Sequence, residues 1–169
     1  EADNVTIKTQ GGSCATLATD RGEGTVIANN SNLETNGSGS PIIYSTGNIS
    51  IDNTEGLANG SQMVVIEGKN SATVTNSTLK ATGKGNRGDV DQAGIMIYQS
   101  MSGDASVGTG NFTAKDSSLN IVSTSDYYNT APMFFITNTD AIINLENTTL
   151  SYGSNILISA KGTSEWGKS

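Results

Sequence analysis

A short phrase recurs five times along this chain, and it limits the folds that the chain can adopt. Each copy places apolar residues at two alternate positions and Asn or Asp two positions later, with a Leu soon after. The copies start at Val26, Ile49, Ala72, Phe112 and Ile143, carry Asn30, Asn53, Asn76, Asp116 and Asn147, and close with Leu33, Leu57, Leu79, Leu119 and Leu150. Because alternate residues of a strand point to one face, each copy predicts a short strand with one buried side, followed by a corner.

The spacing of these copies predicts a coil. Asn30, Asn53 and Asn76 follow one another at equal steps (53 − 30 = 23 and 76 − 53 = 23). The steps to Asp116 and Asn147 are longer (116 − 76 = 40 and 147 − 116 = 31), which indicates insertions that keep the register. A repeat of about 23 residues with two or three short strands is typical of one turn of a parallel β-helix. Stacked turns would align the Asn side chains in a ladder along the coil.

A second family of strands precedes the first in each turn and is apolar at nearly every position. Its members span residues 41–45, 62–66, 94–98, 132–136 and 155–159. Such strands are covered on both faces, so one face lines the coil interior and the other forms an outward apolar strip. The strip consists either of Ile43, Val64, Met96 and Phe134 or of the residues that alternate with them. We expect it to meet a ligand, a covering loop or another chain.

These patterns predict an all-β chain, because no long apolar face with a period of 3.6 residues is present. We predict a single-stranded right-handed parallel β-helix that forms one domain over residues 1–169, and we expect this to be a fragment of a longer chain. Three loop inserts interrupt it, at residues 80–93, 99–110 and 120–131. The first and third inserts occupy the same corner of successive turns, so we expect them to lie side by side.

Composition excludes several classes of function. A net charge of −7 and a pI near 4.4 disfavour nucleic acid and anionic membrane surfaces as partners. No apolar run approaches the roughly 20 residues of a membrane span. The chain has no His, which removes the commonest general base and most zinc sites, and we therefore expect no catalytic residues, although an enzyme stays open. The single Cys14 excludes an internal disulfide and is expected to be a small buried residue.

Candidate ligand-binding residues lie in or beside the inserts, because loops on a rigid scaffold are where binding residues tend to be found. In the third insert an acid, Asp126, precedes Tyr127 and Tyr128, which could stack on a sugar while the acid binds its hydroxyl groups. The tyrosines could equally pin their own loop onto the coil. The remaining candidates are Arg87, Tyr98 and Asp104.

The first insert also contains a candidate metal site. Asn86, Asp89 and Asp91 supply one amide and two carboxylates at close spacing, which suits a hard cation such as Ca²⁺. The spacing lacks the closing Glu of an EF-hand loop. A solvated, glycine-rich loop is the alternative interpretation of the same residues.

Three segments carry a resemblance to known proteins: 38–47, 65–71 and 98–105. They resemble right-handed parallel β-helix proteins of the pectate-lyase-like class, and more narrowly the large secreted or wall-attached proteins of gut bacteria that are called adhesin-like or carbohydrate-binding. The resemblance covers about residues 24–169. It implies an extracellular setting and attachment to glycans or surfaces, and it supplies no ligand residues.

Together these observations favour a secreted or cell-surface, adhesin-like binding module that is not catalytic. Its partner would be a polysaccharide or a glycoprotein surface. The first alternative is a Ca²⁺-dependent polysaccharide lyase or a related glycan-active enzyme, which rests on fold analogy. The second is a structural or self-assembling spacer, with self-association or a partner chain at the C-terminal edge.

Overall fold

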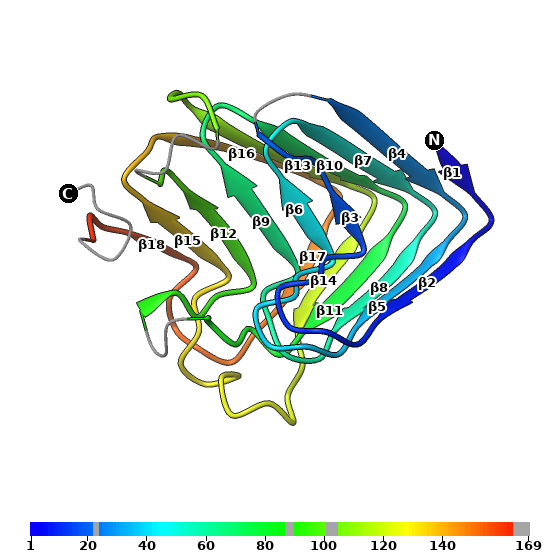
Figure 1. The fold of residues 1–169 in the computed structure, drawn as a ribbon. Helices are drawn as coiled ribbons and strands as arrows, with labels where there is room; N and C mark the ends of the chain where they lie inside the picture. The colour runs from blue at the N-terminus through cyan, green and yellow to red at the C-terminus, as the bar shows by residue number, and fades with distance from the viewer. Residues whose placement is uncertain (22–23, 87–89, 101–104, 164–169) are drawn as a thin grey trace.

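The computed structural model describes residues 1–21, 24–86, 90–100 and 105–163. Among these residues all regular elements are short β-strands, and no α-helix is present. The chain winds as a right-handed parallel β-helix in which each turn adds one strand to each of three parallel, six-stranded sheets (Figure 1). The predicted fold class is therefore confirmed. The described part of the chain also contains no helix that is long and apolar enough to cross a membrane.

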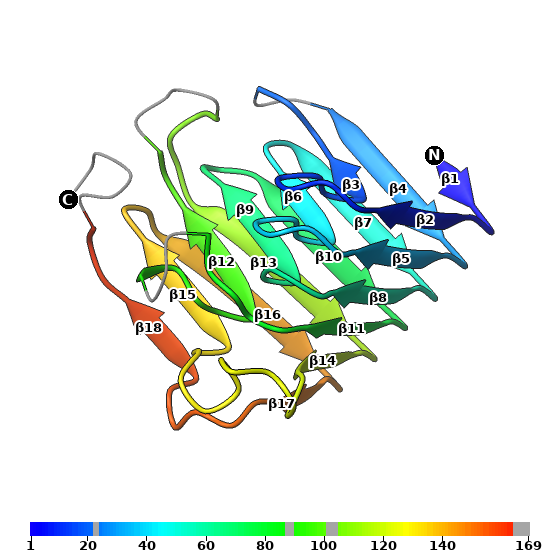
Figure 2. The same cartoon turned by 60° about the horizontal axis from the view of Figure 1, so that its bottom comes forward.

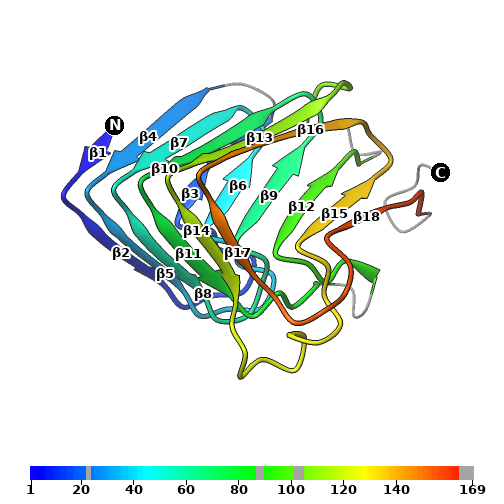
Figure 3. The same ribbon diagram turned by 180° about the vertical axis from the view of Figure 1, so that it is seen from behind.

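The three sheets run along the coil and meet at three corners, which Figure 3 shows from behind. Sheet A consists of β1 (Ala2–Asp3), β4 (Thr25–Asn29), β7 (Asn48–Asp52), β10 (Ser71–Thr75), β13 (Gly110–Lys115) and β16 (Ala141–Glu146). Sheet B consists of β2 (Thr6–Thr9), β5 (Asn32–Thr35), β8 (Glu55–Ala58), β11 (Thr78–Ala81), β14 (Ser118–Ile121) and β17 (Thr149–Ser151). Sheet C consists of β3 (Leu17–Ala18), β6 (Ile43–Ser45), β9 (Val64–Glu67), β12 (Ile95–Tyr98), β15 (Phe134–Thr137) and β18 (Ile158–Ala160).

The repeated phrase forms sheet A in the register that its spacing predicts. Ile51 pairs with Ala28 of the turn before and with Val74 of the turn after. Val74 in turn pairs with Ala114, although two inserts lie between them in the sequence. These side chains are buried in the coil interior and form one continuous core. Each turn thus buries its apolar face only against its neighbours, as in other repeat folds.

The corner between sheet A and sheet B is made by the Asn and Asp residues of the phrase. They adopt left-handed backbone conformations, with φ of 51° at Asn30, 47° at Asn53 and 49° at Asp116. This is a conformation that Asn and Asp adopt more readily than most residues. The side chains also stack, because the Asn53 amide donates to Asn30 Oδ1 (2.7 Å) and the Asn147 amide donates to Asp116 Oδ1 (2.7 Å). The predicted ladder is therefore present at these two steps.

The ladder has a second, buried row beside it, made by the Ser or Thr that follows each corner residue. The Ser31 amide donates to Thr54 Oγ1 (3.3 Å), the Thr54 amide to Ser77 Oγ (3.0 Å) and the Ser77 amide to Ser117 Oγ (3.2 Å). These hydroxyl groups satisfy backbone amides that would otherwise be buried without a partner. The alternation of amide and hydroxyl ladders fixes this corner from turn to turn.

Leu57 is wrongly placed by the sequence pattern. It pairs with Glu34 and Lys80 on the outer side of sheet B, whereas Gly56 pairs with Leu33 and Leu79 in the inward row. A Cβ atom on Gly56 would lie 2.6 Å from Leu79 Cδ2 and 2.9 Å from Ile42 Cδ1. The large neighbours fill the space that a side chain at position 56 would need, so this copy closes with a glycine.

The predicted outward strip of sheet C is wrong at Met96. Ile43, Val64, Ile95 and Phe134 pair in one row and face the coil interior. Met96 pairs with Val65 in the alternate row, and side chains in a strand alternate between its two faces. The outward row therefore consists of Tyr44, Val65, Met96 and Phe135.

Cys14 is exposed, so the prediction of a buried residue is wrong. It lies in the corner between β2 and β3, and its thiol donates to the Gly12 carbonyl oxygen (3.3 Å). This corner lies outside the coil interior, where a small side chain has no core to join.

At the corner between sheet B and sheet C the turns touch through glycine. A Cβ atom on Gly37 would overlap the Gly11 carbonyl oxygen of the preceding turn, and one on Gly60 would lie 2.7 Å from the Gly37 carbonyl oxygen. Since the neighbouring atoms belong to the backbone, they cannot rotate away as a side chain could. Glycine at these positions allows successive corners to stack at backbone contact.

The three inserts leave the coil at two corners. Residues 82–94 and 122–133 connect sheet B to sheet C, and residues 99–109 connect sheet C to sheet A. The predicted inserts began too early, because Lys80 and Asn120 still belong to β11 and β14. The prediction that the first and third inserts share a corner is confirmed.

Candidate functional site

The first and third inserts lie side by side and contact each other. The Ser125 hydroxyl donates to the Thr82 carbonyl oxygen (2.6 Å), and the Thr130 hydroxyl donates to Gln92 Oε1 (3.4 Å). In Figure 2 the third insert is the yellow loop between β14 and β15. We call the surface formed by residues 82–86, 90–94 and 122–133 the insert face. The stacking of turns thus joins segments that are distant in the sequence into one surface.

The third insert holds its own backbone in successive tight turns. The Ser125 amide donates to the Val122 carbonyl (3.0 Å), the Tyr128 amide to the Ser125 carbonyl (3.1 Å) and the Thr130 amide to the Tyr127 carbonyl (3.1 Å). The Ser125 hydroxyl also accepts from the Tyr127 amide (3.1 Å). Asp126 is exposed on this backbone, so its carboxylate is presented to solvent from a fixed position.

Tyr127 and Tyr128 are half-buried and pack against the coil core. The Tyr128 ring lies over Gly153, where a Cβ atom would overlap it, and the Gly153 amide donates to the Tyr128 carbonyl (2.9 Å). The two tyrosines therefore anchor the third insert, which was one of the two roles expected of them. Part of each side chain stays accessible beside Asp126, so contact with a sugar stays a prediction.

The first insert folds back over earlier turns. Asn86 lies against Gly39 in the corner before β6, where a Cβ atom on Gly39 would be 2.8 Å from Asn86 Oδ1. Asp91 is buried, and its Oδ2 accepts from the Asn86 amide (3.0 Å). The Gln62 amide group donates to the Asp91 carbonyl oxygen (2.6 Å). The Asp91 carboxylate thus shapes the backbone of the loop that contains it.

The predicted calcium ligands are only partly described. Asn86 and Asp91 lie together, whereas Asp89 lies outside the described residues. Among the residues that the structure describes, no three His, Cys, Asp or Glu side chains group as metal ligands would. Calcium binding at Asn86, Asp89 and Asp91 stays a prediction.

The remaining candidates are not gathered on the insert face. Arg87 and Asp104 lie outside the described residues. Tyr98 ends β12, at the opposite end of that strand from the insert face. The structure thus brings Asp126, Tyr127 and Tyr128 together and separates Tyr98 from them.

Tyr98 belongs to a polar cluster centred on Glu67, on the outer side of sheet C. Glu67 is 1% exposed, and its Oε2 accepts from the hydroxyl groups of Tyr44 (2.8 Å) and Tyr98 (3.1 Å). The two phenol oxygens lie 2.9 Å apart, and the Ser100 hydroxyl donates to Glu67 Oε1. Three hydroxyl donors therefore compensate the cost of burying this carboxylate. The cluster links three successive turns, because Tyr44, Glu67 and Tyr98 lie in β6, β9 and β12.

Burial raises the pKa of the Tyr98 phenol above its ordinary value, and the neighbouring Tyr44 and Glu67 raise it further. A phenolate would lose its hydration and face the Glu67 carboxylate, so the protonated form is favoured. Tyr98 therefore acts as a hydrogen-bond donor in this cluster and not as a base.

The outward apolar strip beside this cluster is covered. Val65, Met96 and Phe135 are between 2% and 6% exposed, and they pack together with Tyr98 and Ala93 in a second small core. The strip therefore anchors covering parts of the chain and does not offer an open apolar surface. Only Tyr44 of this row, at its N-terminal end, is half-buried.

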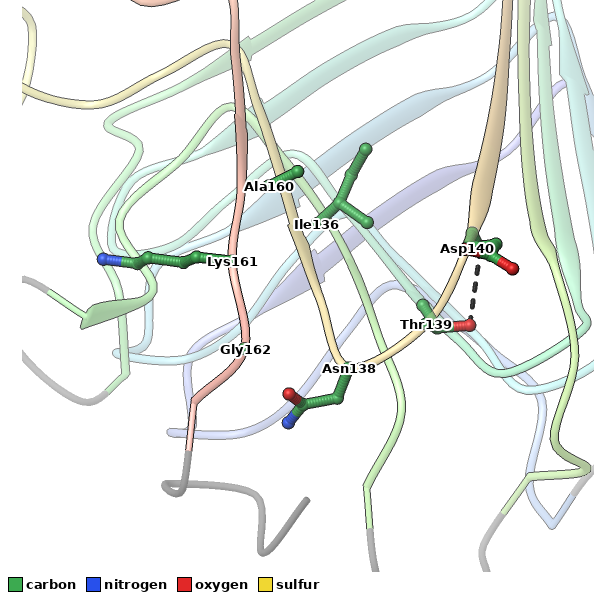
Figure 4. Close-up of a pocket in the computed structure, with 7 residues that line it drawn as sticks. All are labelled: Ile136, Asn138, Thr139, Asp140, Ala160, Lys161 and Gly162. Carbon is green, nitrogen blue, oxygen red and sulfur yellow. Dashed lines mark hydrogen bonds between the residues drawn. The ribbon is translucent and has the colours of Figure 1, made fainter. Parts of the chain in front are cut away.

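An open groove lies at the end of the described coil (Figure 4). Ile136 and Ala160 form its floor, and Asn138, Thr139, Asp140, Lys161 and Gly162 surround it. The Asn138 side chain is already bonded to the Thr163 backbone, at 2.9 and 3.0 Å. The groove lies between the corner after β15 and the end of β18, which is the path that a chain leaving sheet C takes toward sheet A in earlier turns. Coil geometry accounts for it without a ligand.

Sequence reasoning missed Tyr44, Glu67 and Ser100. One signal was present, because Glu67 ends a strand that is otherwise fully apolar, and a carboxylate in that place needs partners. Comparison of this chain with family models, with curated proteins and with solved structures gives no match.

Proposed function

We propose that this chain is a non-catalytic, adhesin-like binding module of a secreted or cell-surface protein, and that it binds a glycan through the insert face. The observation that carries this proposal is the contact between the two inserts at one corner, which presents Asp126 beside Tyr127 and Tyr128. Aromatic surface next to a hydrogen-bonding carboxylate suits a sugar, which has apolar ring faces and hydroxyl groups.

The scaffold supports this proposal. Backbone hydrogen bonds and side-chain packing fix the third insert before any ligand arrives, so little conformational entropy is lost on binding. The resemblance of segments 38–47, 65–71 and 98–105 to adhesin-like β-helix proteins favours the same setting and the same class of partner. The net charge of −7 favours a glycan over a polyanion such as nucleic acid.

A glycan array with and without Ca²⁺ tests the proposal. We expect the wild-type chain to bind a subset of oligosaccharides, and we expect Asp126→Ala to weaken that binding about tenfold, since one charge-assisted hydrogen bond contributes roughly 1.5–3 kcal/mol. Asp126 is exposed, so its removal should leave the melting temperature nearly unchanged.

The matched control is Ser123→Ala, an exposed position in the same insert that should leave both binding and stability unaltered. Binding that is absent from the whole array, with or without Ca²⁺, would contradict the glycan proposal. Release of unsaturated oligosaccharides from uronate polymers would replace it with a polysaccharide lyase.

Self-assembly is a second candidate, which the apolar surface of the last turn favours. Ile142, Leu145, Ile156, Leu157 and Ile158 are between 40% and 49% exposed. A contiguous apolar surface of this kind commonly meets another chain. Sedimentation velocity over a concentration series tests this candidate, and a sedimentation coefficient independent of concentration would exclude it.

A further inference from the structure

Tyr44 stands at the edge of the covered strip, where an aromatic ring is both fixed and partly accessible. Its phenol oxygen bonds to Glu67 Oε2 at 2.8 Å and lies 2.9 Å from the Tyr98 oxygen. Glu67 and Tyr98 are themselves buried, at 1% and 9% exposure. The tip of the Tyr44 ring is therefore held by two groups that cannot move without disturbing the fold.

The neighbours of Tyr44 along its row leave one side of the ring less covered. Val65 is its partner on the C-terminal side and belongs to the small core. Ala18 is its partner on the N-terminal side, and this short side chain is exposed. Tyr44 accordingly stays half-buried, whereas the rest of the row is closed.

The insert face borders the strand that carries Tyr44. Asn86 of the first insert lies against Gly39, which shortly precedes Tyr44 in the sequence and begins the approach to β6. A ligand bound at this end of the insert face is thus close to the outer side of β6.

From this arrangement we propose that the Tyr44 ring is a preorganised stacking contact for an uncharged sugar, which extends the glycan site from the insert face onto sheet C. The inference rests on the proposed function. A tyrosine ring that is already fixed supplies contact area at a low entropic cost. The sugar should be uncharged, because an anionic group beside Tyr44 would lie close to the Glu67 carboxylate, in a chain of net charge −7.

The test measures binding of Tyr44→Phe and Tyr44→Ala to an array of neutral, sialylated and uronate-containing oligosaccharides. Tyr44→Ala removes the ring, and neutral oligosaccharides should bind about tenfold more weakly or not at all. Tyr44→Phe keeps the ring and loses its two polar anchors, so an intermediate loss is expected. Thermal melts accompany both variants, and Tyr44→Phe keeps the test valid if Tyr44→Ala is poorly folded. Thr73→Ala, on the outer side of sheet A, is the control and should bind as the wild type does.

The outcomes separate this inference from the proposed function. Neutral binding that falls in the order wild type, Tyr44→Phe, Tyr44→Ala supports it. Neutral binding that survives Tyr44→Ala, while Asp126→Ala weakens it, overturns the role of Tyr44 and leaves the insert face in place. A preference for sialylated or uronate-containing oligosaccharides overturns the assigned ligand class. A wild-type chain that binds nothing on the array overturns both proposals.

Discussion

Substitution of Gly37 should open the coil at the corner between sheet B and sheet C. A Cβ atom at this position overlaps the Gly11 carbonyl oxygen, and the nearby Gly11 carbon and Gly12 nitrogen also belong to the backbone. Relief of this clash requires the first two turns to move apart. Two backbone hydrogen bonds flank Gly37, from the Asn36 amide to the Thr9 carbonyl and from the Ser13 amide to the Ser38 carbonyl, both 3.0 Å.

The expected cost of Gly37→Ala follows from these contacts. Overpacking costs about 1–3 kcal/mol, and weakening two backbone hydrogen bonds adds about 1 kcal/mol each. The free energy of unfolding should therefore fall by about 3–5 kcal/mol, which corresponds to a decrease in melting temperature of about 10 °C for a chain of this size.

Two further glycines provide a graded control. A Cβ atom on Gly60 would lie 2.7 Å from the Gly37 carbonyl oxygen, so Gly60→Ala should cost about 1–3 kcal/mol. A Cβ atom on Gly12 would meet nothing closer than the Ser38 carbonyl oxygen at 3.5 Å, and Gly12→Ala should cost less than about 1 kcal/mol. Urea unfolding followed by circular dichroism gives the three values. If Gly37→Ala is as stable as Gly12→Ala, backbone contact between turns is not what requires glycine here.

Two other predictions follow from buried aromatic residues. Tyr98 keeps its proton in the fold while an unfolded tyrosine loses it near pH 10, so above that pH the unfolded chain binds fewer protons and stability falls, by up to about 1.4 kcal/mol per pH unit for this group. Tyr98→Phe should make the urea midpoint less dependent on pH between 9.5 and 11 (about one unit around the ordinary tyrosine pKa); an unchanged slope would show that Tyr98 is not buried. Phe112 is fully buried with its ring 5.9 Å from that of Phe134, so Phe112→Ala should reduce the free energy of unfolding by about 3–5 kcal/mol in the same assay. A loss below about 1 kcal/mol would place Phe112 outside the core.

Much of the fold could be predicted because the repeat carries its own register. Asn30, Asn53 and Asn76 mark one corner at constant spacing, and their left-handed backbone is a property of the residue type. The prediction failed where two adjacent residues compete for one position. Leu57 is apolar and close to the expected place, yet the side chains of Leu79 and Ile42 leave room only for Gly56. Such a choice depends on packing between turns, which no single repeat reveals.

The candidate site was less accessible to sequence reasoning, because it depends on side chains that meet across turns. The alignment of the inserts at one corner followed from the register, and it was predicted. The Glu67 cluster was missed, because Tyr44, Glu67 and Tyr98 lie in three different turns and an insert separates the last two. Tyr44 also occupies a different row from Glu67 and Tyr98, and only the length of a phenol allows it to reach them.

Cross-strand nuclear Overhauser contacts on isotopically labelled protein test the stacking of turns most directly. Neighbouring strands of a sheet lie about 4.8 Å apart, so paired residues give contacts between backbone protons. Ala72, Thr73 and Val74 should contact Phe112, Thr113 and Ala114 in that ascending order, and should contact Ile49, Ser50 and Ile51 in the same order on the other side. Contacts whose partner numbers descend as the strand ascends would show antiparallel pairing, and would contradict the parallel coil on which the shared corner of the two inserts depends.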